Sequence, residues 1–60
     1  MPLYVLYIHD DRYTVPAMRT AEAPENTAAQ ATAAQILNES PHYRAVEVWL
    51  DDNLVARLDR

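Results

Sequence analysis

The residues with the clearest chemical potential are two histidines and a pair of adjacent aspartates, namely His9, Asp10, Asp11 and His42. Imidazole nitrogens and carboxylate oxygens together are typical ligands of zinc and other transition metals. In the fold expected below, both histidines lie at one rim of the sheet, beside the two aspartates. An aspartate pair is also ordinary turn material, and these residues follow no fixed metal-binding spacing. The sequence therefore predicts a turn and no bound metal or other cofactor, with the four-residue metal site as the alternative.

Pro2 is the second candidate for chemistry. The stretch "PLYVLYIHDDR", from Pro2 to Arg12, resembles the start of the tautomerase family, in which a proline exposed by removal of the initiator Met acts as the base. The resemblance implies Pro2 as general base and Arg12 as a second site residue. After Arg12 the chain departs from that family, because "YTVPAMRTAEA" replaces the start of a long helix and Glu47 falls near the position of a second arginine. A proline at the start of a strand needs no catalytic role. We expect no catalytic residues, with a tautomerase-like enzyme as the alternative.

Charge and composition exclude several classes of function. Nine acidic residues oppose five basic ones, all arginine, and the net charge is -4. An acidic surface repels phosphate backbones, so nucleic acid is not an expected partner. No apolar run approaches the roughly 18 residues of a membrane span, and the first residues are typical of a strand rather than a signal peptide, so we expect a cytoplasmic protein. The absence of cysteine excludes disulfides and thiolate zinc sites.

The first third of the chain predicts two strands. Leu3 to His9 is rich in β-branched and aromatic residues, and Tyr13 to Thr20 follows after a short polar turn. Pro16 cannot donate a hydrogen bond to a neighbouring strand, so the second strand should lie at an edge of the sheet.

The middle of the chain, from Ala23 to Ser40, is the only helical stretch. Alanine dominates it, Pro24 suits the first helical position, and Glu25 complements the positive end of the helix dipole. Spacings of three and four residues place one apolar stripe on a single face, made of Ala29, Ala33, Ile36 and Leu37.

The last stretch, "AVEVWLDDNLVARLDR", predicts a hairpin. A three-residue loop of residues 51–53 would place all apolar partners on one face and would put Asn53 in the left-handed conformation that such loops need. The chain has no glycine, so any positive φ must fall on Asn or Asp. The expected pairs are Leu50 with Leu54, Val48 with Ala56, Val46 with Leu58, Trp49 with Val55, and Glu47 with Arg57.

These elements predict one α+β domain over residues 1–60. The order is ββαββ, with one helix packed on a four-stranded antiparallel sheet of strand order 2-1-3-4. The helix covers one face of the sheet. The other face carries the expected interface residues, which are Val5, Tyr7, Glu47, Trp49, Val55 and Arg57.

The uncovered face leads to the functional prediction. A domain of 60 residues buries little surface, and large exposed apolar patches usually mark interfaces. We therefore expect a non-catalytic protein that forms a homodimer, or binds another protein, through this face. Base stacking on Tyr7, Trp49 and Tyr43 is the alternative use of the same aromatics, and it lacks the surrounding basic charge that nucleic acid requires.

Taken whole, the chain resembles short bacterial proteins of unknown function that open with "MP-Y" and close with a segment like "AVEVWLDDNLVARL". The shared motifs are a strand and a hairpin. The resemblance implies a small free-standing protein and carries over no site residues.

Overall fold

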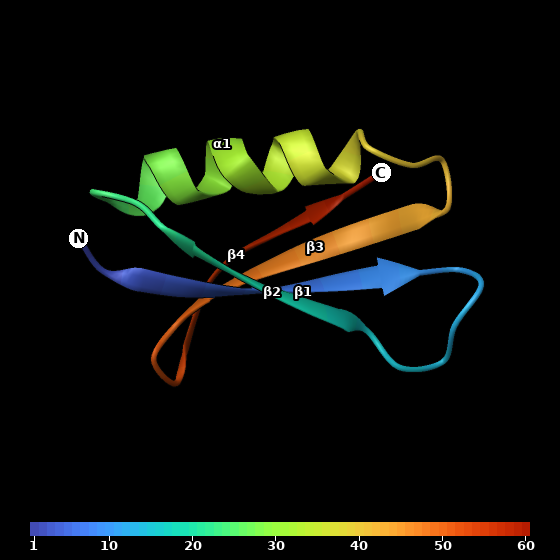
Figure 1. The fold of residues 1–60 in the computed structure, drawn as a ribbon, viewed down its shortest axis with the longest axis horizontal. Coiled ribbons are helices and arrows are strands. Elements are labelled where there is room, and N and C mark those ends of the chain that lie inside the picture. The colour runs from blue at the N-terminus through green and yellow to red at the C-terminus, as the bar shows by residue number, and fades with distance from the viewer.

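The computed structural model describes all 60 residues as a helix laid on one face of a four-stranded sheet (Figure 1). The elements, in chain order, are β1 (Leu3–Asp10), β2 (Ala17–Glu22), α1 (Asn26–Leu37), β3 (Tyr43–Leu50) and β4 (Asn53–Asp59). The sheet order is β2-β1-β3-β4, and every neighbouring pair is antiparallel. The predicted fold class and strand order are confirmed.

The hydrophobic core lies between α1 and the sheet. Successive residues of a strand point to opposite faces, and in β1 the buried residues alternate with half-buried ones. The two central strands supply the largest fully buried side chains, as the apolar character of their sequences predicts. They are Tyr4, Leu6, Ile8, Val46 and Val48.

The helix fits closely over the sheet because its inner face is small. Its buried residues are the predicted Ala29, Ala33, Ile36 and Leu37. The start of the helix differs from the prediction: α1 begins at Asn26, so Pro24 lies outside it. Glu25 is the N-cap, with extended backbone, and its carboxylate accepts hydrogen bonds from the backbone N–H groups of Thr27 and Ala28 at 3.0 and 2.9 Å. These bonds satisfy two of the amides that a helix start leaves free.

The second strand starts later than predicted. Residues 11–16 form a loop, and β2 begins at Ala17, directly after Pro16. Proline has no backbone N–H, and the chain enters the ladder only once that restriction has passed. The edge position of β2 is confirmed.

The predicted three-residue loop of the closing hairpin is wrong. The pairs Val48–Ala56, Glu47–Arg57 and Val46–Leu58 are confirmed, but Leu50 pairs with Asn53 and Trp49 pairs with Leu54. The loop therefore holds two residues, and its left-handed residue is Asp51, with φ of 54°, rather than Asn53. A bulge leaves Val55 without a partner of its own, and this extra residue restores the register beyond it.

The last residue joins the sheet to the end of the helix. The Arg60 guanidinium donates to the backbone oxygens of Leu37, Ser40 (2.7 Å) and Tyr43 (2.7 Å), and its backbone N–H donates to Arg44 O at 2.8 Å. Arg60 thus places a cation at the negative end of α1, where it satisfies the Leu37 carbonyl group that the helix leaves free.

Candidate functional site

The face of the sheet that α1 leaves uncovered brings together most of the predicted interface residues. Val5 pairs with Trp49 across β1 and β3, and Tyr7 pairs with Glu47 two residues further along. All four are half-buried in the single chain, because the twisted strands and their neighbours partly cover one another. Trp49 is therefore already partly shielded from water before any partner binds.

Glu47 organises the polar part of this face. Its carboxylate accepts hydrogen bonds from Trp49 Nε1 at 2.9 Å and from Arg57 Nη1 at 3.1 Å, and it lies 2.8 Å from His9 Nε2. The indole donor, followed by His9 and Arg57, lowers the pKa of Glu47 below its ordinary value. The predicted Glu47–Arg57 cross-strand pair is thus present. The network also fixes the orientation of the Trp49 ring, since a planar indole can place Nε1 on a given acceptor in few ways.

A shallow pocket of about 270 Å³ lies beside the Trp49 ring, and it is the one pocket of the molecule. Its lining residues are Val5, Tyr7, Trp49, Asp51 and Asp52. All five arginines bind carboxylates or carbonyl groups elsewhere, and neither Asp51 nor Asp52 takes part in an ion pair. The pocket therefore combines an aromatic wall with two unpaired negative charges.

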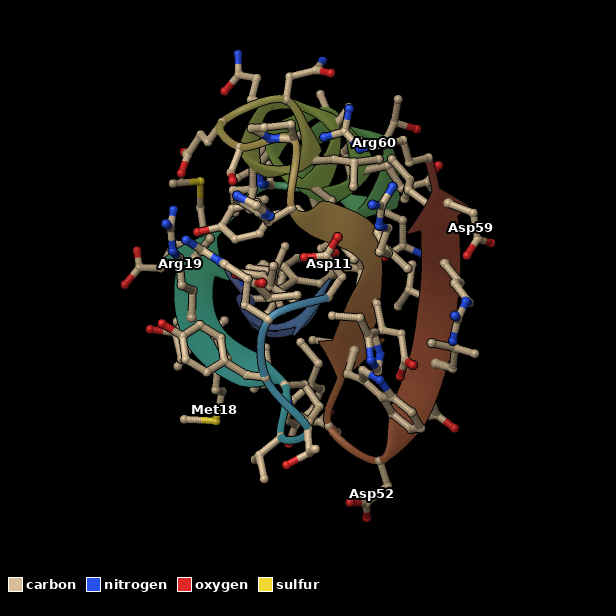
Figure 2. The ribbon with its side chains drawn as sticks, turned by 90° about the vertical axis from the view of Figure 1, so that its right-hand side faces the viewer. Asp11, Met18, Arg19, Asp52, Asp59 and Arg60 are labelled. Atoms are coloured by element: carbon tan, nitrogen blue, oxygen red, sulfur yellow. The ribbon has the colours of Figure 1, made fainter.

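Exposed apolar side chains extend the uncovered face toward its edges. Met18 pairs with Tyr7, Leu54 pairs with Trp49, and Leu3 shares the face of Val5 by strand alternation. Leu3, Met18 and Leu54 are each more than half exposed. In Figure 2, Met18 points away from the helix, and Asp52 marks the tip of the β3–β4 turn on that side. Sequence reasoning missed Met18 and Leu54 because their places on this face depend on the true start of β2 and on the hairpin bulge, whereas alternation along β1 could have identified Leu3.

Two aromatic or apolar residues are placed differently from the prediction. Val55, at the bulge, is half-buried and packs against the core cluster, and Tyr43 does the same. The three aromatics of the alternative stacking surface, Tyr7, Trp49 and Tyr43, are therefore not assembled as a set.

The four candidate metal ligands do not meet at one point. His9 pairs with Glu47, while Asp10 binds Arg12 through both carboxylate oxygens at 3.0 and 2.6 Å. The Arg12 hydrogen bonds lower the pKa of Asp10 to about 2. No group of three or more histidine and carboxylate side chains stands in a metal-binding arrangement.

Asp11 and His42 are the one pair of those four residues that the fold brings together, with 3.1 Å between Asp11 Oδ1 and His42 Nδ1. Arg44 also binds Asp11, through Nε at 3.1 Å and Nη2 at 2.6 Å. Hydrogen bonding from Arg44, and secondarily from His42, lowers the pKa of Asp11. This arrangement ties the β1–β2 loop to the start of β3.

Pro2 and Arg12 lie at opposite ends of β1. The strand between them has eight residues, so they are separated by about 26 Å at about 3.3 Å per residue. Arg12 is engaged with Asp10, and the carbonyl of Pro2 accepts a hydrogen bond from the Ala23 N–H at 3.2 Å. A single chain therefore does not bring together the base and the arginine that the tautomerase resemblance implies.

The fold and the site define a small two-layer α+β domain with an uncovered apolar sheet face. Comparisons with protein-family models, with curated proteins and with solved structures find no match for the chain. Its single helix is too short and insufficiently apolar to cross a membrane.

Proposed function

We propose that this protein is a non-catalytic self-associating domain, and that two copies pack through the sheet faces that α1 leaves uncovered. The observation that supports this proposal best is the run of apolar side chains across that face. Half-buried Val5, Tyr7 and Trp49 continue into the exposed Met18 and Leu54. Contiguous apolar surface of this kind is typical of an interface.

The size of the face suits a second copy of the same chain. Four strands spaced about 4.8 Å apart and up to eight residues long present about 19 by 26 Å, so two faces would bury about 1,000 Å² in total. That area is near the lower limit for a specific interface. Two-fold homodimers are also the commonest closed assemblies, and a small domain gains stability from a partner.

The charged groups in the middle of the face would allow a second copy to pack closely against it. Glu47 is paired with Arg57 within the chain, and Trp49 Nε1 donates a hydrogen bond to the same carboxylate. A second copy therefore meets paired polar groups in the middle of the face, so little unpaired charge would be buried there.

The competing assembly joins sheet edges. Pro16 directly precedes the edge strand β2, and β4 ends in charged residues that bind within the chain. Prolines and charges at edges oppose strand addition. The face-to-face arrangement is therefore the one proposed, and the cytoplasmic location expected from the sequence stays a prediction.

Sedimentation of the wild type and of a matched pair of variants tests this proposal. Met18→Arg adds a charge to an exposed position of the face, whereas Gln35→Arg adds the same charge to an exposed position of α1. Burial of one large apolar side chain contributes about 1.5–3 kcal/mol, so Met18→Arg should weaken the dimer at least tenfold and Gln35→Arg should not. Circular dichroism confirms that both variants fold.

Trp49 provides a second readout, since it is the only tryptophan. Because the ring is half-buried in one chain, a blue-shifted emission alone does not report the dimer. We expect quencher access to Trp49 to fall as protein concentration rises through the dissociation constant. Trp49→Ala should give a monomer or an unfolded chain. A folded wild-type monomer at micromolar concentration, with unchanged quenching on dilution, would refute the proposed function.

A further inference from the structure

The β1–β2 loop, residues 11–16, carries two large apolar side chains that are mostly exposed in the single chain. Tyr13 is 67% exposed and Val15 is 74% exposed. The Arg12 guanidinium lies over the Tyr13 ring, 5.4 Å from its centroid, and its Nε and Nη2 donate to the Asp10 carboxylate. The loop therefore presents a cation and an aromatic ring as one preformed unit.

This loop and the β3–β4 turn project from opposite ends of the sheet. Figure 1 shows both on the side away from α1, the loop at one end of the long axis and the turn at the other. That axis measures 32 Å. Asp52 lies at the tip of the turn in Figure 2, and the pocket of Val5, Tyr7, Trp49, Asp51 and Asp52 lies at its base. The uncovered face is thus bordered by the loop that carries Arg12 and Tyr13 at one end and by the anionic turn of Asp51 and Asp52 at the other.

We propose that the β1–β2 loop of a second copy fills this pocket in the homodimer, so that each subunit completes the pocket of the other. This inference rests on the proposed function. A two-fold axis that lies in the interface and crosses the long axis exchanges the two ends of the molecule. Each loop then meets the partner's turn, and the assembly contains two equivalent contacts.

Charge selects this arrangement over its alternative. A two-fold axis along the long axis would place the two turns together, with four unpaired carboxylates from two copies of Asp51 and Asp52. Like charges at an interface oppose association. The selected arrangement instead keeps the two turns apart and brings Arg12, which is paired with Asp10, near one pair of those carboxylates. Asp10 occupies Nε and Nη2 of Arg12, which leaves the donors of Nη1 for the partner.

The pocket suits an aromatic side chain in character. Its volume of about 270 Å³ is below the roughly 300–1,000 Å³ of small-molecule sites. Trp49 and Tyr7 offer ring surfaces on which a third aromatic ring can pack edge to face or in an offset stack. Tyr13 is the exposed aromatic of the loop, and it enters the pocket with Arg12 directed toward the two carboxylates.

Cross-linking between single-cysteine chains tests the geometry, and the chain has no cysteine of its own. Tyr13→Cys chains are mixed with Asp52→Cys chains and treated with a short bis-maleimide. We expect cross-linked dimers in the mixture and in neither variant alone. Gln30→Cys, on the exposed side of α1, replaces Tyr13→Cys in the control mixture and should give none. Cross-links within Tyr13→Cys alone would indicate the other two-fold axis and would overturn the inference.

Sedimentation separates failure of this inference from failure of the proposed function. Tyr13→Ser should raise the dimer dissociation constant at least tenfold, and Tyr13→Phe, which keeps the ring, should not. The double variant Asp51→Asn, Asp52→Asn should raise it several-fold at low salt and make it less dependent on salt. A wild-type dimer that all these changes leave intact would refute the loop-in-pocket contact and leave self-association standing. A wild-type monomer would refute both.

Discussion

Replacement of Arg60 by alanine should destabilise the domain more than removal of any surface ion pair. The Arg60 side chain donates to three backbone oxygens, on Leu37, Ser40 and Tyr43. These oxygens belong to the end of α1, the connection after it and the start of β3. Arg60, which directly follows β4, therefore holds the helix against the sheet. Figure 2 shows Arg60 beside the helix.

The magnitude follows from those contacts. A net hydrogen bond contributes about 0.5–1.5 kcal/mol, and the two solvent-exposed bonds belong at the lower end of that range. A cation at a helix C-terminus adds about 0.3–1 kcal/mol. Arg60→Ala should therefore cost about 2 kcal/mol, against a total of roughly 3–5 kcal/mol for a domain of this size. At about 4–8 °C per kcal/mol, the melting temperature should fall by about 8–16 °C.

Thermal and urea unfolding followed by circular dichroism measure this loss. Arg19→Ala is the matched control, because Arg19 pairs with the exposed Glu39 carboxylate, and exposed pairs contribute about 0–1 kcal/mol. Arg60→Lys keeps the charge but loses the planar fork, so its melting temperature should lie between those of wild type and Arg60→Ala. All measurements are made at one protein concentration, since dimerisation also raises the melting temperature. Equal melting temperatures for Arg60→Ala and Arg19→Ala would refute the reasoning.

Three further changes test the acid response, the helix cap and the helix–sheet contact. The folded-state pKa values of Asp10 and Glu47 lie below the unfolded values of 3.8 and 4.5. The two carboxylates therefore stabilise the fold above about pH 4.5, and this contribution is lost as the pH falls toward about 2. Urea midpoints that stay constant as the pH is lowered across this window would contradict the prediction. Glu25→Ala removes the acceptor of two amides at the start of the helix and should lower the free energy of unfolding by about 1 kcal/mol, as measured by urea unfolding. Glu25→Asp keeps a carboxylate on a short side chain favoured at N-caps, so it should retain most of that stability. Tyr4→Phe removes the 2.7 Å bond from the buried Tyr4 hydroxyl to Asn26 Oδ1 and should cost about 0.5–1.5 kcal/mol, and an unchanged melting temperature would show that this bond contributes nothing.

The sequence alone determined the architecture, because the patterns that specify it are local. Alternating apolar residues fix the strands, the alanine-rich stretch with its stripe fixes the helix, and Pro16 marks an edge. The central pairs of the hairpin were also predictable, since Val48 must face the core with Ala56 if Glu47 is to face Arg57. The absence of glycine correctly restricted the positive φ to Asn or Asp.

Only the tertiary structure decided which residues complete the edges of the candidate site and form its pocket. A two-residue loop with a bulge and a three-residue loop give the same register beyond Val55, so the apolar pattern of the hairpin could not distinguish them. The two-residue loop of the structure places Leu54 rather than Val55 opposite Trp49. The position of Arg60 at the end of α1 depends on a contact between residues more than twenty positions apart. The pocket beside Asp51 and Asp52 likewise exists only because β1 and β3 are adjacent. Contacts of this kind depend on how separate segments meet in three dimensions, and residue periodicity along one segment carries no record of that meeting.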